Sequence, residues 1–145
     1  MSGLRIRPGQ SSDVDVVKSW LASAGLPTED LTADHMQGFL VAEVDGDAAG
    51  AIGLEQLGDI ALLRSLVVDP SRRSGGIGAQ LVAALEQKAA AAGIRQLWLL
   101  TIDADRYFVN LGWTVSDRAD APPAIRATQE FSSLCPGDAV VMSKG

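Results

Sequence analysis

One stretch near the middle of the chain constrains the fold more than any other: residues 64–78, which read RSLVVDPSRRSGGIG. Its apolar residues Leu66, Val67 and Val68 predict a buried strand, and the Asp-Pro pair that follows ends that strand. Two arginines and a glycine cluster come next, and residues 78–92 predict a long helix. A strand, a glycine-rich turn and a helix in this order point backbone N–H groups and the positive end of a helix dipole at one place. The stretch therefore predicts a phosphate or pyrophosphate site.

The spacing of the arginine and the glycines narrows the choice of ligand. Arg73-x-x-Gly76-x-Gly78 fits the pattern R/Q-x-x-G-x-G/A. With the strand before it and the helix after it, this motif resembles the acetyl-CoA pyrophosphate loop of the GNAT N-acetyltransferase superfamily. The alternative is a glycine-rich turn that binds nothing. A Walker A loop would need Lys and Ser or Thr where Ala79 and Gln80 stand, and a Rossmann fingerprint would need a third glycine where Leu81 stands.

The resemblance implies acetyl-CoA as the co-substrate, held by the strand, the loop and the start of the helix. The cofactor-binding residues that it predicts are Leu66, Val67, Val68, Arg72, Arg73, Ser74, Gly75, Gly76, Ile77, Gly78, Ala79 and, from a later helix, Phe108. We expect no metal, because the sequence holds no cluster of His and Cys.

Composition limits the class of protein. The 145 residues suffice for one domain, which we expect to cover 1–145, and 47% are hydrophobic. A net charge of −6 argues against nucleic acid or an anionic membrane as a partner. The single cysteine, Cys135, suits a reducing compartment, and its expected place is buried before a turn. With neither a signal peptide nor a run of about 18 apolar residues, the expected location is the cytoplasm.

Patterning along the chain predicts an α/β fold of the GNAT type. We expect a mixed, mostly antiparallel central sheet of about six to seven strands, flanked by about four helices. The expected strands are 4–7, 39–44, 48–56, 60–68, 95–101, 113–115 and 139–142. The expected helices run from a cap at Ser11 or Ser12 to 24, and over 29–36, 78–92, 103–111 and, within an insertion, 125–131. Small residues in the strand 48–56 predict the close approach of another element.

A second anchor of the resemblance is the sequence ADRYFVNLGW. It looks like the superfamily pattern A-x-x-F-Y-x-x-x-G-F, whose tyrosine protonates the departing CoA thiolate. Here the residue four before Gly112 is Phe108, and the hydroxyl lies one residue earlier, on Tyr107. Neighbouring helix positions differ by about 100°, so Tyr107 does not simply replace the missing tyrosine. Tyr107 is either the catalytic acid or a core aromatic, and in the second case water or another residue is the acid, or none is needed.

Three segments carry a narrower resemblance: GLEQLGDIALLRSLVV, the Tyr-Phe variant just described, and APPAIRATQEFSSLCP. Together they resemble the GNAT proteins encoded in bacterial arsenic-resistance operons, and the most distinctive marks are residues 126–128 and 133–136. This resemblance implies a small amino acid as the acceptor.

An amine must lose a proton before it attacks a thioester, and a carboxylate can take it. Glu55 is the candidate for general base or for contact with the substrate amine. The alternative is that Glu55 pairs with Arg64 across the strands. The predicted substrate-binding residues are Glu55, Arg64, Ser65 and Arg126, and the alternative for Arg126 is a solvated side chain.

The functional prediction is direct acetyl transfer to a small-molecule amine acceptor. Its alternative is a sensor that binds acetyl-CoA without turnover, which Phe108 at the usual tyrosine position supports. His35, the only histidine, is expected at the surface. The resemblance also allows a homodimer, formed through the C-terminal strand.

Overall fold

The computed structural model describes residues 4–24, 28, 31–72, 76–101, 104–128, 131 and 139–145. The predictions for Arg73, Ser74, Gly75 and Cys135, and for the side chain of His35, fall outside the described residues.

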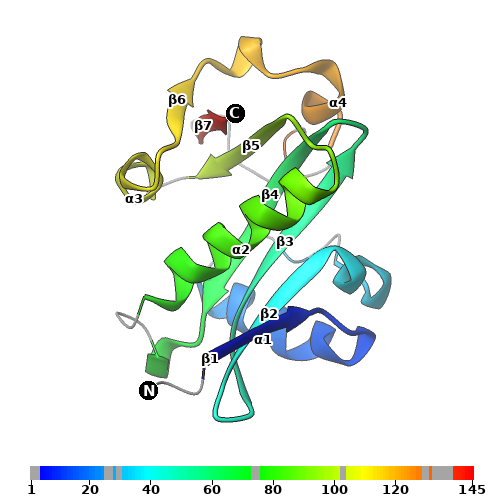
Figure 1. The fold of residues 1–145 in the computed structure, drawn as a ribbon, viewed down its shortest axis with the longest axis vertical. Helices are drawn as coiled ribbons and strands as arrows, with labels where there is room; N and C mark the ends of the chain where they lie inside the picture. The colour runs from blue at the N-terminus through cyan, green and yellow to red at the C-terminus, as the bar shows by residue number, and fades with distance from the viewer. Residues whose placement is uncertain are drawn as a thin grey trace. The chain divides into compact units, whose positions relative to one another are not determined.

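The described residues form four α-helices and seven strands (Figure 1). The helices are α1 (Val14–Ser23), α2 (Ile77–Ala91), α3 (Asp105–Asn110) and α4 (Pro123–Arg126). The strands are β1 (Leu4–Pro8), β2 (Phe39–Val44), β3 (Asp47–Leu57), β4 (Ile60–Val68), β5 (Gln96–Thr101), β6 (Thr114–Ser116) and β7 (Val140–Lys144). Their order in the sheet is β1-β2-β3-β4-β5-β7-β6. Strands β4 and β5 pair in parallel, whereas β1–β2, β2–β3, β5–β7 and β6–β7 are antiparallel, so the predicted fold class is confirmed.

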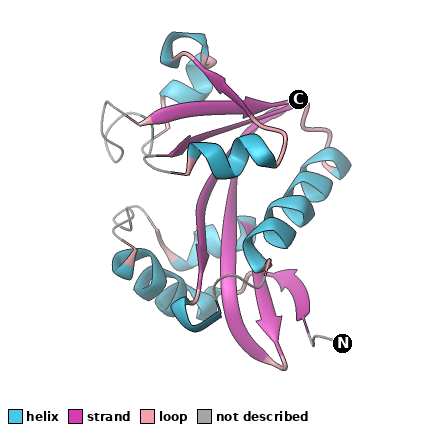
Figure 2. Cartoon of the chain, turned by 90° about the vertical axis from the view of Figure 1, so that its left-hand side faces the viewer, coloured by secondary structure: helices cyan, strands magenta, loops and turns pink. Residues whose placement is uncertain are grey.

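Contacts along the chain group into two compact units. Unit 1 comprises Met1–Leu54 and Ser65–Lys88, and unit 2 comprises Glu55–Arg64 and Ala89–Gly145. The two long strands β3 and β4, drawn in magenta in Figure 2, each contribute residues to both units. The expectation of one domain over 1–145 stays a prediction.

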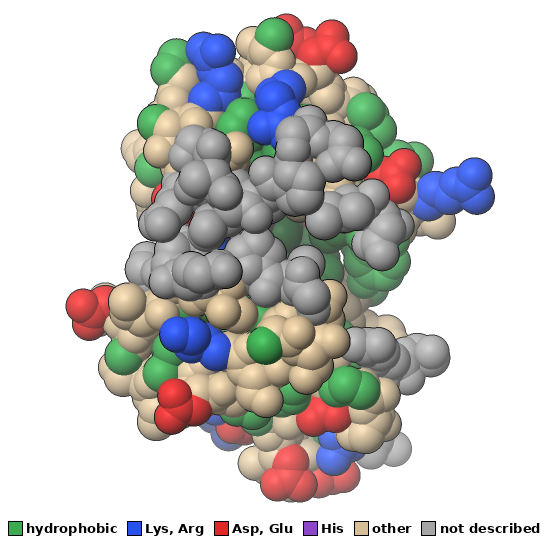
Figure 3. Space-filling view, turned by 180° about the vertical axis from the view of Figure 1, so that it is seen from behind, with side chains coloured by type: hydrophobic (Ala, Val, Ile, Leu, Met, Phe, Trp, Pro, Cys, Tyr) green, Lys and Arg blue, Asp and Glu red, His purple; other side chains and the backbone are tan. Residues whose placement is uncertain are grey.

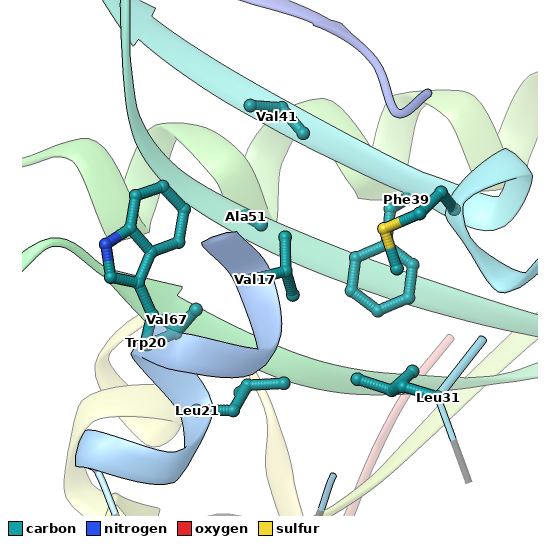
Figure 4. Packing of buried hydrophobic residues seen from close by; sticks show 9 residues of the cluster. Val17, Trp20, Leu21, Leu31, Phe39, Val41, Ala51 and Val67 are labelled. Carbon is teal, nitrogen blue, oxygen red and sulfur yellow. The ribbon is translucent and has the colours of Figure 1, made fainter. Parts of the chain in front are cut away.

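In unit 1, helices α1 and α2 lie on opposite faces of the strands (Figure 4). Alternation along β3 serves both faces: Ala51 joins the core beneath α1, while Gly50 faces α2. A Cβ atom on Gly50 would lie 2.9 Å from the carbonyl oxygen of Val67 and 3.3 Å from Cδ1 of Leu81. The predicted close approach at the small residues of β3 is therefore confirmed.

Buried apolar side chains pack helix α1 against the strands of unit 1. Val17 and Leu21 share the buried helix face, as their spacing predicts. The whole cluster consists of Val17, Trp20, Leu21, Leu31, Met36, Phe39, Val41, Ala51 and Val67. It fixes α1 to the same strands that lead into the glycine-rich turn.

The first helix does not begin as predicted. Neither serine caps it; a 3-10 turn, Ser11–Asp13, precedes it, and Asp13 accepts the backbone N–H of Gln10 at 2.7 Å. The carboxylate also pairs with Arg7 at 2.8 Å, and Arg7 reaches Glu43 at 2.6 Å. The hydrogen bond from Arg7 holds the pKa of Asp13 below its usual range, so this buried carboxylate is ionised.

Two other predicted helices are displaced. In place of a helix over 29–36, the structure has a 3-10 helix at Ala33–Gly38. The insertion helix was expected over 125–131, but α4 spans Pro123–Arg126. Proline presets the backbone at the first helical position, and the hydroxyl of Thr128 donates to the carbonyl of Ile125 at 2.7 Å, which closes the turn after four residues.

Unit 2 has its own core, formed by Leu62, Trp98, Ala121, Ile125, Phe131 and Val141. Strand β7 pairs with β5 on one side and with β6 on the other. Within one chain, strand β7 is therefore flanked by strands on both sides. The dimer itself stays a prediction.

Candidate functional site

Strand β4 changes its backbone conformation at Ser65. The φ angle of this residue is +59°, a left-handed conformation that costs a residue with a side chain about 1 kcal/mol. The strand continues through Leu66 and Val68, which are half-buried, and Val67, which is buried in the core of unit 1 beside Trp20 (Figure 4). Val67 thus anchors the strand segment Leu66–Val68, whose backbone is predicted to bind the cofactor.

Asp69 organises the turn that follows β4. Its backbone N–H donates to the carbonyl of Ala49 at 2.8 Å, and its own carbonyl accepts the N–H of Arg72 at 2.9 Å. Its Oδ1 atom accepts both the backbone N–H of Ser71 at 2.9 Å and the Ser71 hydroxyl at 2.7 Å. These bonds shape the 3-10 turn Pro70–Arg72, which leads into the predicted cofactor loop.

Among the described residues, the backbone at the start of helix α2 is open. Gly76 precedes it at a φ of +80°, and its carbonyl accepts the N–H of Gln80 at 3.1 Å. A Cβ atom on Gly76 would meet no described atom within 4 Å. The first turn of α2 carries no acidic side chain, whereas α1 and α3 carry Asp15 and Asp105 there. Three features therefore suit an anion at this position: N–H donors, the helix dipole and open space.

The remaining predicted loop residues differ in exposure. Ile77 is buried, with 7% of its surface exposed, and anchors the start of α2. Arg72, Gly78 and Ala79 are half-buried, so their backbones lie near the surface of unit 1. Their contact with a cofactor stays a prediction.

In unit 2, Glu55 and Arg64 form an ion pair. The Arg64 Nη1 and Glu55 Oε1 atoms are 3.6 Å apart, and the two side chains are 3% and 33% exposed. The predicted alternative, in which these residues pair across the strands, is therefore confirmed. The pair leaves the Glu55 carboxylate partly accessible to solvent, so a role for Glu55 with an amine stays a prediction.

Of the two aromatic residues on α3, Phe108 lies in the core and Tyr107 is exposed. Phe108 is 5% exposed and packs edge-on against Trp113, with ring centroids 5.8 Å apart. Tyr107 is 39% exposed and touches Phe108 edge-on at 5.3 Å. Reading Tyr107 as a core aromatic is therefore wrong, because Phe108 occupies that position. Partial burial raises the pKa of Tyr107, so its phenol is protonated at neutral pH.

Arg126 lies at the end of α4 with an exposed side chain, as the solvated alternative predicts. Its binding to a substrate stays a prediction. Buried Thr128, two residues later, is used structurally: its Oγ1 atom bonds the carbonyl of Ile125 and accepts the N–H of Phe131 at 3.3 Å.

Sequence reasoning missed the role of Asp69, which it treated only as a strand stop. A signal was present, because an Asp side chain in a turn often hydrogen-bonds the backbone two residues further on. The partner of its second carboxylate oxygen, Trp20, lies 49 residues away in sequence and gave no such signal.

Other classes of site receive no support from the part of the chain that the structure describes. That part has no group of three His, Cys, Asp or Glu side chains able to hold a metal ion. It also contains no helix long and apolar enough to span a membrane. Basic and acidic side chains are interspersed on the face drawn in Figure 3.

Comparison with known proteins gives a family match over most of the chain. Residues 10–113 match the acetyltransferase (GNAT) family. The amino-acid acetyltransferase of Neisseria meningitidis serogroup A / serotype 4A is 27% identical over 95 residues, which are 64% of this chain and 22% of the relative. This chain thus spans about a fifth of the length of the curated relatives it matches.

Solved structures share the fold at low identity. N-acetylglutamate synthase from Neisseria gonorrhoeae, in complex with coenzyme A and L-arginine, has a TM-score of 0.85 at 21% identity, over 99% of this chain and 33% of its own. Rv2747 from Mycobacterium tuberculosis, in complex with CoA, has a TM-score of 0.82 at 23% identity, over 96% and 97%. Diaminobutyrate acetyltransferase EctA from Paenibacillus lautus, with its substrate L-2,4-diaminobutyric acid and coenzyme A, has a TM-score of 0.72 at 17% identity, over 100% and 96%.

Proposed function

Because the chain belongs to the acetyltransferase (GNAT) family, we propose that it transfers the acetyl group of acetyl-CoA directly to the amine of a small, amino-acid-like acceptor. The observation that carries this proposal is the start of α2 after Gly76, where no described atom would meet a Cβ on Gly76 and the first turn holds no carboxylate. Complexes of related structures with CoA support the choice of donor.

In the proposed complex, the pyrophosphate of acetyl-CoA accepts hydrogen bonds from the N–H groups between Arg73 and Ala79. The pantetheine arm pairs with the backbone of Leu66–Val68. Arg72 adds positive charge, and no metal is required, since the donors and the helix dipole already favour the anion.

The transfer forms one bond and breaks another. The amine nitrogen attacks the thioester carbonyl, a carboxylate takes the amine proton, and the C–S bond breaks to release the CoA thiolate, which a protonated group then neutralises. Glu55 is the proposed base, directly or through water, and its partial exposure suits the role. Tyr107 is the proposed acid, because its phenol is protonated at neutral pH and its side chain is partly exposed.

The proposed acceptor carries a carboxylate beside its amine. Relatives named as an amino-acid acetyltransferase and a diaminobutyrate acetyltransferase support an amino-acid acceptor. Arg64 and Arg126 are the proposed partners of the substrate carboxylate, since a guanidinium binds a carboxylate through two parallel hydrogen bonds. Ser65 is a further proposed contact of the substrate. Arg126→Glu should then raise the KM for an anionic acceptor and leave the affinity for acetyl-CoA nearly unchanged.

A finer proposal concerns the biological role. Residues 126–128, with the marks at 133–136, support the acetylation of a toxic amino-acid-like compound in arsenic resistance, in the cytoplasm. Residues 133–136 lie outside the described part of the chain, so the sequence alone supports this role.

The second candidate function is a sensor that binds acetyl-CoA without turnover. Burial of Phe108 at the position where the superfamily pattern has its catalytic tyrosine favours it. A screen of amino acids and their analogues for release of free CoA separates the two functions. Release that depends on an added amine supports the enzyme, whereas tight binding with only background hydrolysis supports the sensor.

Isothermal titration with acetyl-CoA tests the shared premise of both functions. We expect saturable binding of one ligand per chain. No detectable heat of binding at millimolar acetyl-CoA would contradict both.

A further inference from the structure

The carboxylate of Asp69 uses its two oxygens in two different directions. Oδ1 accepts the N–H and the hydroxyl of Ser71, within the turn. Oδ2 accepts the indole N–H of Trp20, on helix α1, at 3.2 Å. One side chain thus joins helix α1 to the turn that leads into the predicted cofactor loop.

The indole of Trp20 is held firmly in place. It is 8% exposed and packs in the core of unit 1 next to Val67, two residues before Asp69 (Figure 4). A buried indole N–H needs an acceptor, because leaving it unpaired costs free energy. Packing therefore aims this donor at the point where β4 ends.

Only an acceptor with two oxygens can satisfy both neighbours of Asp69. An asparagine that bonded Ser71 through its oxygen would turn its NH2 group toward the Trp20 N–H, donor against donor. A carboxylate next to a predicted anion site is otherwise unfavourable, because like charges repel. The hydrogen bonds from Ser71, chiefly, and the charge of Arg72 lower the pKa of Asp69, so the carboxylate remains ionised at neutral pH despite its neighbourhood.

We propose that Asp69 is a positioning residue for the cofactor loop, and that its hydrogen bond from Trp20 couples helix α1 to the occupancy of that loop. This inference rests on the proposed function, because the loop is taken to bind acetyl-CoA. Asp69 touches no cofactor itself; it fixes the turn Pro70–Arg72, from which the loop departs. Loss of either partner then loosens the loop and weakens cofactor binding.

The test compares two buried tryptophans that each donate to a side chain. Trp20 donates to Asp69, and Trp98, which is 4% exposed in unit 2, donates to Gln96 at 2.9 Å. Trp20→Phe and Asp69→Asn should each weaken CoA binding by about tenfold, the loss expected for one hydrogen bond to a charged acceptor. Trp98→Phe should leave CoA affinity within about twofold, although it removes a similar hydrogen bond.

Two further measurements separate positioning from general stability. The double variant Trp20→Phe/Asp69→Asn should bind CoA about as tightly as the single variant with the lower affinity. Both substitutions remove the same hydrogen bond, so their effects should not add. In the wild-type protein, the indole N–H resonance of Trp20 should shift on addition of CoA while that of Trp98 stays in place. The resonance measurement needs no variant, so it decides the question even where a substitution prevents folding.

The outcomes distinguish this inference from the proposed function. No CoA binding by the wild-type protein overturns the proposed function and the inference with it. CoA binding without a shift of the Trp20 resonance overturns the inference alone, as does wild-type affinity in both single variants.

Discussion

The two longest helices that the structure describes, α1 and α2, begin in different ways. Just before α1, the carboxylate of Asp13 accepts the N–H of Gln10 and pairs with Arg7, so a charged group of the chain itself stands at this helix start. At the start of α2, Gly76 has a positive φ, a Cβ atom on it would meet no described atom within 4 Å, and the first turn has no carboxylate. The difference suggests that helix N-termini in one small chain can serve different ends: α1 has a carboxylate of the chain at its start, whereas we propose that the donors at the start of α2 serve a ligand.

The largest expected effect comes from breaking the closed start of α1. Asp13→Ala leaves the Gln10 N–H without its acceptor and removes one of the two carboxylates around Arg7, so we expect a loss of about 3 kcal/mol in the free energy of unfolding. Urea unfolding followed by circular dichroism measures it. Exposed Asp15, in the first turn of α1, is the control, and Asp15→Asn should change stability by less than about 0.5 kcal/mol. Equal losses in the two variants would contradict the closed start.

The open start of α2 is tested with two glycines of matched geometry. Gly76 and Gly93 both have φ near +80°, and a Cβ atom on either would meet no described atom within 4 Å. Alanine at either position should therefore cost a similar backbone strain, about 1 kcal/mol. Only Gly76→Ala should also weaken CoA binding, by about tenfold or more, equivalent to at least about 1.4 kcal/mol. If titration calorimetry gives both variants the same CoA affinity, the space beside Gly76 does not hold the ligand.

These two helix starts also show what the sequence could predict. The strand-turn-helix order around Gly76 was readable because glycines, proline and apolar runs have local effects on the backbone. Likewise the turn at Asp45 and Gly46, with φ of +52° and +88°, and the cap at Gly93 follow from local preferences. The role of Asp13 was missed, although its bond to Gln10 is local; its ion pair with Arg7, which also pairs with Glu43, forms only in the folded chain.

In the candidate site too, the features set by neighbouring residues were predictable and those set by distant residues were not. The cofactor loop follows from a contiguous motif, and the pairing of Glu55 with Arg64 was one of two open alternatives. The link between Trp20 and Asp69 joins residues 49 positions apart, and no periodicity marks it. The sequence could not show that Phe108, rather than Tyr107, is the core aromatic of α3, because this depends on how Phe108 packs against Trp113.

The strand that leads to the open start offers a smaller test. Ser65 holds a φ of +59°, which glycine adopts freely and β-branched residues strongly resist. Ser65→Gly should leave stability within about 1 kcal/mol of the wild type, whereas Ser65→Val should lower it by about 2 kcal/mol. Thermal unfolding measures both. A valine variant as stable as the glycine variant would contradict the left-handed conformation at this position.

The smallest effect concerns pH. The pKa of Asp13 is lowered in the folded state, so its contribution is fully present above its unfolded pKa, near 3.9, and is lost as the pH falls through the lower folded value. We expect stability to be insensitive to this group between pH 5 and pH 7, at least about one unit above its unfolded pKa, and to fall below about pH 4. In the Asp13→Asn variant, stability should fall less steeply as the pH is lowered below about 4. Unfolding midpoints from about pH 2 to pH 7 would show it, and identical acid limbs would contradict the assignment.

The most direct test of the contrast between the two helix starts is an amide resonance titration of the wild-type protein with CoA. If α2 provides the pyrophosphate site, the amides of Gly76, Ile77, Gly78 and Ala79 should show the largest shifts, and inorganic pyrophosphate should reproduce part of them. The amides of Gln10 and Ser11–Asp13, whose helix start is closed by Asp13, should stay in place. Binding of CoA with unshifted α2 amides, or with equal shifts at both helix starts, would contradict the account.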